Sequence, residues 1–333
     1  MMHSFMKYIY LSAVMGCILL CTSCDGVIYD NEGDCSVNYR VEFKYDYNMK
    51  FADAFAHEVE YVTLYLIDSD GNVAWKRTES GEALAADGYT MTVDAAPGTY
   101  DMLAWCGTAG NGSFAVADGS VATELQCRLN CSHDAGGRAI VDTEVDRLFH
   151  GYLPAQTLVD TEGTYTFTMP LVKDTNSVRV VLQHLSGEPV EADDFLFCIT
   201  AANGSLDWDN SLLPDEALCY HAWHTETGFA DFDDSRSTFS AAIAEFTVSR
   251  LVPGLDARLT VSNRDTGVTV LSIPLVEFLV MVKGFYNREM DDAEFLDRQD
   301  SYDLTFFLDE RDRWISSFIY INSWKVVLQN AGL

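Results

Sequence analysis

The sequence is short of basic residues. Lys and Arg number 21 against 51 Asp and Glu, which gives a formal net charge of -30 over 333 residues. Binding to nucleic-acid phosphates needs a basic face, so this charge excludes nucleic acid as a partner. The same charge repels an anionic lipid surface. We therefore expect the folded body to stay off a membrane unless a covalent group holds it there.

The sequence also lacks catalytic signatures. It contains no G-x-S-x-G, no H-E-x-x-H and no phosphate-binding loop. No pair of residues can be nominated as a general acid and a general base. We therefore predict that the protein is not an enzyme and that it needs no cofactor.

Metal-binding patterns are weak. The one close histidine pair, His221-x-x-His224, could place two ligands on one helix face, with acidic residues of the stretch 231–234 nearby. The acidic stretches 207–210 and 231–234 could offer oxygen ligands to Ca²⁺, but neither has the order of an EF-hand loop. Solvated loops with Asx turns are the favoured interpretation, so we predict no metal site.

The N-terminal residues have the pattern of a processing segment. Lys7 supplies a positive start, and Tyr8 to Leu20 form an apolar core that is too short to span a bilayer. Small residues before Cys24 resemble the lipobox of bacterial lipoproteins, although Cys21 stands where Leu is usual. We predict a signal peptide over 1–23, acylation of Cys24 and a lipidated tether over 24–36. An ordinary cleaved signal peptide is the alternative. No later apolar run is long enough to predict a transmembrane helix.

An even number of cysteines follows Cys24. In an exported chain such cysteines can form disulfides, but the sequence cannot choose among the connectivities. Each could equally be a small buried hydrophobic residue. The candidate disulfide cysteines are Cys35, Cys106, Cys127, Cys131, Cys198 and Cys219.

Alternating hydrophobicity predicts a mainly β fold. Strict alternation over 37–47 predicts a strand with one buried face and one exposed face. Asp70-Gly71 predicts a hairpin turn, and short helices are expected at 51–57 and after Pro274. Turns at short intervals between the strands favour β-sandwiches over a parallel sheet. The other expected strands cover 62–66, 73–77, 89–93, 100–105, 165–169, 178–182, 246–248, 259–261, 268–270, 302–308 and parts of 315–328.

Several separated stretches carry a family resemblance. The first half contains CDGVIYDNEGDCSVNYRVEFKYDYNMKFADAF and VEYVTLYLIDSDGNVAW, and the second half contains MPLVKDTNSVRVVLQHLSG, ANGSLDWDNSLLPD and IYINSWKVVLQN. On these stretches the chain resembles the FimB/Mfa2 family of fimbrial anchor lipoproteins from Bacteroidales. The resemblance covers essentially the whole chain.

The resemblance implies a fold and a function. The fold is that of type V pilins, with two tandem transthyretin-like β-sandwich domains, which we place at 37–171 and 172–333. Such proteins carry palmitate-type acyl chains on the cysteine that matches Cys24 and are exposed on the cell outer membrane. They hold the base of a fimbria and limit its length, and their partners are major or minor pilin subunits joined by strand exchange. The acidic residues behind Cys24 resemble an export signal to the outer leaflet: Asp25, Asp30, Glu32 and Asp34.

The same resemblance bears on proteolysis. Structural pilins of this class are released from lipid by cleavage after an Arg near the N-terminus, whereas an anchor must keep its lipid. No Lys or Arg occurs between Cys24 and Arg40, and Arg40 lies inside the strand predicted over 37–47. We therefore predict that the tether survives arginine-specific proteolysis.

Two other functions stay open. One is a surface glycan-binding lipoprotein, which would need exposed aromatic side chains beside acids. The other is a fimbrial adhesin or stalk subunit. An exposed, pairable sheet edge or an open hydrophobic groove would favour pilus assembly, whereas a flat aromatic platform would favour sugar binding.

Overall fold

The computed structural model describes residues 36–108, 112–231, 238–286 and 289–328. The predicted lipidation site, Cys24, therefore lies outside the described residues. So do Cys35 and the residues predicted to form the export signal: Asp25, Asp30, Glu32 and Asp34. In the part of the chain that is described, no helix is long and apolar enough to cross a membrane.

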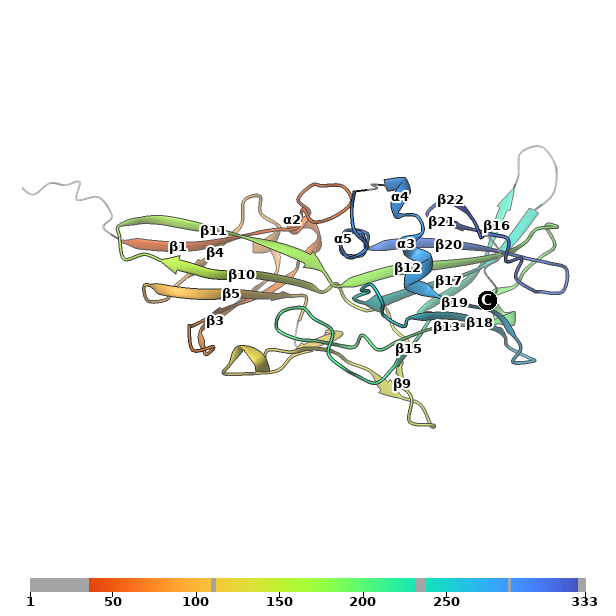
Figure 1. Ribbon diagram of the computed structural model, residues 1–333, viewed down its shortest axis with the longest axis horizontal. Helices are drawn as coiled ribbons and strands as arrows, with labels where there is room; N and C mark the ends of the chain where they lie inside the picture. Colours follow the sequence, from red (N-terminus) through yellow and green to blue (C-terminus); the bar gives the residue numbers. More distant parts are fainter. Residues whose placement is uncertain (1–35, 109–111, 232–237, 287–288, 329–333) are drawn as a thin grey trace, which may run out of the picture. The chain divides into compact units, whose positions relative to one another are not determined.

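A seven-stranded sheet contains most of the first half of the chain, in the order β3-β2-β5-β10-β11-β1-β4 (Figure 1). Its strands are β1 (Val37–Lys44), β2 (Tyr61–Ile67), β3 (Val73–Ser80), β4 (Thr90–Val93), β5 (Gly98–Cys106), β10 (Phe149–Leu158) and β11 (Gly163–Lys173). The alternation over 37–47 is confirmed for β1, which buries Tyr39, Val41 and Phe43. The predicted hairpin is also confirmed, because Gly71 adopts a φ of 83° between β2 and β3.

A six-stranded sheet of the second half has the order β16-β17-β12-β20-β21-β22. Its strands are β12 (Thr175–His184), β16 (His224–Asp231), β17 (Thr238–Ser249), β20 (Ser301–Leu308), β21 (Phe318–Ile321) and β22 (Trp324–Val327). β12 pairs with β20 in parallel and with β17 antiparallel. The last two strands form a hairpin in which Trp324 opposes Ile321.

Strands from both halves share the two remaining sheets. One has the order β19-β18-β13-β15-β9-β8, and the other has the order β14-β7-β6. β9 pairs in parallel with β15, and β7 pairs with β14. The sheets thus exchange strands across residue 171, and the domain boundary expected there stays a prediction. The strands are β6 (Phe114–Val116), β7 (Cys127–Leu129), β8 (Ser132–His133), β9 (Ala139–Val141), β13 (Phe195–Ala201), β14 (Ser205–Leu206), β15 (Leu218–His221), β18 (Arg258–Asn263) and β19 (Thr269–Pro274).

The helices are short. They are α2 (Phe55–Glu58), α3 (Leu275–Val280), α4 (Lys283–Tyr286) and α5 (Asp292–Arg298), with 3-10 turns at Glu82–Ala85, Ala122–Glu124 and Ala192–Asp194. α2 overlaps the end of the stretch 51–57 that was expected to be helical, and Pro274 is the N-cap of α3 rather than its first residue. α5 was not predicted. Its N-cap, Asp291, accepts a hydrogen bond from the Glu294 backbone N–H at 2.8 Å.

A large cluster of buried side chains combines residues from several sheets. Trp105 of β5, Val180 of β12 and Ile199 of β13 all belong to it and are fully buried. Burial of this apolar surface is the main source of stability for such a β protein. The mainly β fold with a few short helices, as predicted, is confirmed.

Candidate functional site: an apolar strand edge and an acidic cleft

β22 is an edge strand with exposed apolar side chains. Within the described residues it is the last strand of its sheet. Trp324 is 42% exposed and Val327 is 66% exposed. Such an edge offers backbone hydrogen-bonding groups that a further strand could pair with.

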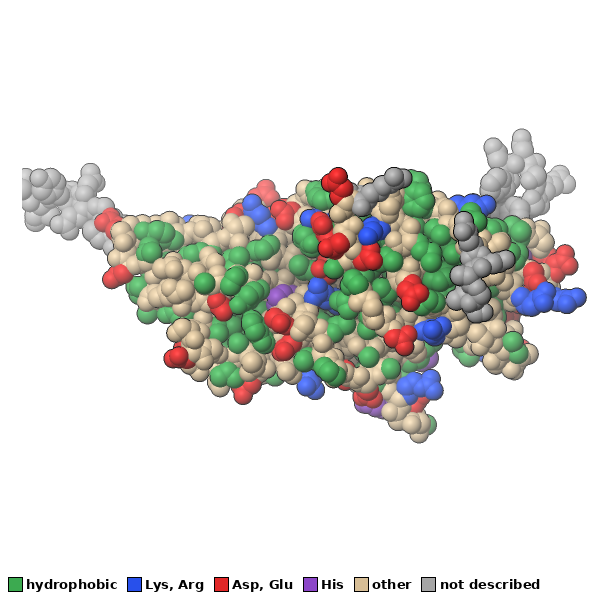
Figure 2. Space-filling model, in the orientation of Figure 1, with side chains coloured by type: hydrophobic (Ala, Val, Ile, Leu, Met, Phe, Trp, Pro, Cys, Tyr) green, Lys and Arg blue, Asp and Glu red, His purple; other side chains and the backbone are tan. Residues whose placement is uncertain are grey.

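One face of this edge carries an aromatic stack. The rings of Trp324 and Phe285 lie parallel, with centroids 4.6 Å apart and an interplanar angle of 7°. Tyr286, the last residue of α4, accepts a hydrogen bond on its hydroxyl from Asn322 Nδ2 at 3.2 Å. Figure 2 shows hydrophobic side chains at the surface near α4. This face is therefore apolar and held by side-chain contacts from two elements.

The opposite face of the edge is aromatic as well. Val327 opposes Phe318 across the hairpin, and the ring of Phe318 lies 5.1 Å from that of Phe307. Tyr320 completes this cluster, with its ring 5.8 Å from Phe307. Lys325 Nζ lies 4.4 Å from the centre of the Phe318 ring, in a cation–π contact. Both faces of β22 thus present apolar surface to an added strand.

Several of the other sheet edges are more polar or shorter. β3 exposes Lys76 and Arg77, and β8 has only two residues. β16 begins with the polar run His224 to Thr227 and contacts the 3-10 turn Ala192–Asp194. Long apolar edges are a liability that proteins usually block with charge or short length. β22, with exposed Trp324 and Val327, is one of the described edges where that protection is weak, and β19 is another.

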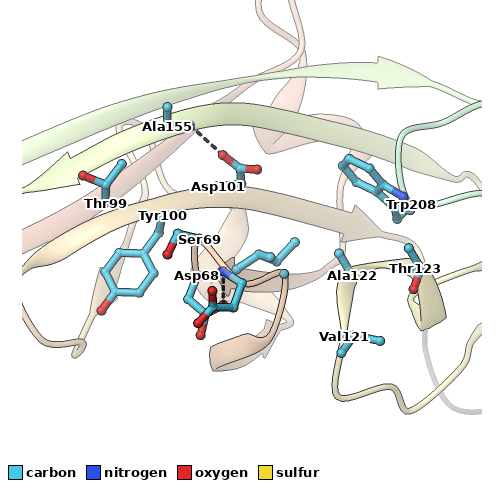
Figure 3. A pocket seen from close by; sticks show the side chains of 13 residues that line it. Asp68, Ser69, Thr99, Tyr100, Asp101, Val121, Ala122, Thr123, Ala155 and Trp208 are labelled. Carbon is cyan, nitrogen blue, oxygen red and sulfur yellow. Dashed lines mark hydrogen bonds between the residues drawn. The ribbon is translucent and has the colours of Figure 1, made fainter.

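A cleft of about 600 Å³ opens on the first sheet (Figure 3). Trp208 and Tyr100 lie at opposite ends of the view, with Asp68 and Asp101 between them. Among the described residues that line the cleft, three are Asp and none is Lys or Arg. The cleft is therefore acidic, with aromatic side chains at its ends.

Asp101 is fixed by two hydrogen bonds. Its Oδ1 accepts from the Ala155 backbone N–H at 2.7 Å, and its Oδ2 accepts from the Tyr152 hydroxyl at 2.8 Å. Ala155 has a φ of 52°, in a register shift of β10 that turns its N–H toward Asp101. Burial and the contact with Asp101 raise the pKa of Tyr152 to about 12, so its hydroxyl remains a donor at neutral pH.

Trp208 is held from the opposite side of the cleft. Its backbone carbonyl lies 2.9 Å from Nε2 of the buried His150. Its ring meets that of Tyr152 edge to face, with centroids 5.4 Å apart. Asp207 and Asp209, taken from sequence as weak Ca²⁺ candidates, accept hydrogen bonds from the backbone of their own turn instead. The turn therefore presents the indole in one position.

The histidine pair does not lie on a helix. His221 ends β15 and His224 begins β16, so the helical spacing considered from sequence is wrong. His224 Nε2 lies 3.7 Å from a Glu226 carboxylate oxygen, at an exposed position. In the described part of the chain, no group of three or more His, Cys, Asp or Glu could hold a metal ion.

Of the candidate disulfide cysteines, Cys198 and Cys219 form a disulfide that joins the neighbouring strands β13 and β15. Cys106 and Cys127 are buried free thiols, and burial raises the pKa of both. Cys131 is an exposed free thiol. None of these three is disulfide-bonded, which corrects their candidacy.

Comparisons with known proteins identify relatives of this fold. A family model of fimbrillin-A associated anchor proteins Mfa1 and Mfa2 matches residues 31–330. A candidate adhesin from Bacteroides thetaiotaomicron is 33% identical, with a TM-score of 0.80 over 87% of this chain and 97% of that one. A candidate polysaccharide-binding protein from the same organism is 30% identical, with a TM-score of 0.77 over 89% of this chain and 99% of that one.

A more distant structure shares the fold. The fimbrial anchor protein Mfa2 from Porphyromonas gingivalis is 17% identical, with a TM-score of 0.67 over 89% of this chain and 100% of that one. No curated protein matches the chain. The family model covers most of the sequence, so the chain belongs to the family of fimbrillin-A associated anchor proteins Mfa1 and Mfa2.

Proposed function

We propose that this protein anchors the base of a type V fimbria to the outer membrane and limits the length of the fimbria. The acyl chains would sit on Cys24, residues 24–36 would form the tether, and two β-sandwich domains at 37–171 and 172–333 would form the body. Two or three acyl chains give stable membrane attachment where one does not. Family membership supports the fimbrial role, and no enzymatic activity is proposed.

The edge of β22 is the observation that carries the proposal. An extended pilin segment laid along this edge would gain backbone hydrogen bonds from the sheet. Because side chains alternate along a strand, its apolar residues would meet the Trp324 face and the Phe318 face in turn. The partner we infer is therefore a pilin segment with apolar side chains on both faces.

Deletion and complementation test the anchor role. Loss of the protein should leave fimbriae detached in the medium or abnormally long, as seen by electron microscopy of cells and culture supernatant. The wild-type gene should restore short, attached fimbriae. Unchanged fimbriae in the deletion strain would overturn the proposal.

A matched pair of variants tests the strand edge. Val327→Lys places a charge on the exposed edge of β22, whereas Thr269→Lys places the same charge on β19, which is the edge strand of another sheet. Only Val327→Lys should fail to restore attachment. If both variants restore it equally, the anchor role stands and the contact at β22 does not.

Lipidation is tested separately. Cells grown with an alkyne-tagged palmitate should label the wild-type protein and should not label Cys24→Ala. Cys24→Ala should also appear in the soluble fraction. Equal labelling of both proteins would show that Cys24 is not the acylated residue.

A further inference from the structure

We propose that the cleft between Tyr100 and Trp208 binds an uncharged carbohydrate chain, an activity separate from fimbrial anchoring. The cleft measures about 600 Å³, within the range of roughly 300–1,000 Å³ typical of small-ligand sites. It lies on the first sheet, whereas the edge of β22 belongs to another sheet. The two surfaces can therefore be tested independently.

Charge narrows the ligand class. Asp68, Asp70 and Asp101 line the cleft, and no Lys or Arg is among its described lining residues. A phosphate, sulfate or uronic acid would meet uncompensated repulsion here. A metal ion is not favoured either, since no suitable ligand group exists among the described residues. The charge therefore excludes an anionic ligand, and we propose a neutral one that supplies hydrogen-bond donors.

Sugar hydroxyls are such donors. Each carboxylate oxygen of Asp101 already accepts one hydrogen bond from the protein, which leaves further acceptor capacity on both. Ser69, Thr99 and Thr123 add hydroxyl groups that can donate or accept. The edge of a pyranose ring, with its row of hydroxyls, matches this mixture of carboxylate acceptors and hydroxyl groups that donate or accept.

The aromatic residues match the other surface of a sugar. Pyranose rings have apolar faces of C–H groups, which pack against indole and phenol rings. Trp208 and Tyr100 are half-buried, and Figure 3 shows them at opposite ends of the cleft. An oligosaccharide could therefore contact one ring at each end and place its hydroxyls near Asp101.

The site is ordered before any ligand arrives. The Trp208 turn is held by His150, and Asp101 is held by Ala155 and Tyr152. Little conformational entropy is then lost from the protein on binding, which favours affinity. Ala155 adopts its left-handed φ at the point where its backbone N–H orients Asp101.

Isothermal titration of the purified full chain tests the proposal with neutral hexasaccharides of glucose, mannose, xylose and N-acetylglucosamine. At least one should bind with a millimolar or tighter Kd, and hexagalacturonate should bind at least tenfold more weakly. Trp208→Ala should weaken the positive interaction at least tenfold. The matched control Trp324→Ala removes an exposed indole outside the cleft and should leave the affinity unchanged.

A second variant tests the cleft independently, in case Trp208→Ala misfolds. Thr123 is exposed at the cleft, so Thr123→Arg should block it while leaving the thermal unfolding curve unchanged. Absence of binding by every neutral probe would overturn the proposal. So would binding that survives both cleft variants, or equal binding of a neutral Gly-Ser-Thr peptide of similar length. Fimbrial attachment should follow the opposite pattern, lost with Val327→Lys and kept with Thr123→Arg.

Discussion

Asp174 Oδ1 lies 3.6 Å from Arg250 Nε, and the Asp174 side chain is completely buried. Arg250 Nη2 also donates to both carboxylate oxygens of Asp297, at 2.9 and 3.1 Å. Asn210 Nδ2 donates to Asp174 Oδ1 at 2.9 Å. This network links the junction of β11 and β12 to α5 and to the turn that carries Trp208.

The network makes stability depend on pH through Asp174. Burial raises its pKa to about 7, against the attraction of Arg250 and the hydrogen bond from Asn210. The folded state therefore binds a proton that the unfolded state has released. The resulting stabilisation is complete below about pH 4 and is lost as pH rises through 7.

Asp174→Asn removes this titration. The unfolding free energy of the variant minus that of the wild type should rise by about 2–3 kcal/mol as the pH increases from 5 to 8, because only the wild type loses this stabilisation. Urea denaturation across this range measures the difference. Parallel pH profiles for the two proteins would contradict the prediction.

His150 should act in the opposite direction. Burial lowers its pKa to about 4, so the unfolded chain binds a proton that the folded chain does not. Stability from this group is present above about pH 6.5 and is lost as pH falls toward 4. His150→Gln does not titrate and has an amide donor for the Trp208 carbonyl. It should reduce the loss of stability between pH 7 and pH 5 by about 2 kcal/mol.

The denaturation series for His150→Gln has its own internal check. The tryptophan emission spectrum of the folded variant should stay close to that of the wild type at pH 7, because the turn that carries Trp208 keeps a hydrogen-bond donor. If the variant loses as much stability as the wild type on acidification, His150 is not the group responsible.

The local hydrophobic pattern predicts where the strands lie better than it predicts which strands pair with each other. The alternation from Val37 onward places Tyr39 and Val41 in the core, because side-chain period depends only on nearby residues. The parallel pairing of β9 with β15 joins residues about eighty positions apart, and no local signal specifies it. α5 could have been found, because Asp291 and Glu294 have the spacing of a capped helix start.

The candidate sites were harder to read from sequence. The stretch around Trp208 looks like an acidic loop, and its role depends on contact with His150, 58 positions earlier. Likewise, Trp324 and Val327 fit any strand, and only the sheet order makes β22 an edge. Edge position and cleft lining are properties of the assembled sheets, so hydrophobic periodicity cannot show them.

The free cysteines should differ in reactivity. Burial, with nearby carboxylates, raises the pKa of Cys131 as well as that of Cys106 and Cys127, but Cys131 is exposed and the other two are buried, so a reagent can reach only Cys131. Iodoacetamide added to the folded protein should modify Cys131 and spare the other two, as peptide mass spectrometry would show. In urea all three should react. Labelling of Cys106 before unfolding would contradict the packing of β5.

Arg40 should resist arginine-specific protease in the folded protein. Its side chain is exposed, but its backbone lies in β1, between β11 and β4, with Thr92 as its partner on β4. Cleavage needs an extended segment freed from the sheet, and opening a strand in the middle of a sheet exposes its core face. N-terminal sequencing after digestion should find no fragment beginning at Val41, whereas the urea-unfolded protein should yield one.

A new arginine in the proposed tether supplies the control for this experiment. Glu32→Arg places a cleavable residue ahead of β1, so protease should release the body of this variant from cells while the wild type stays attached. The comparison separates protection by the sheet from a general failure of the protease to reach the surface. A fragment beginning at Val41 from the folded wild type would show that the strand does not protect the anchor.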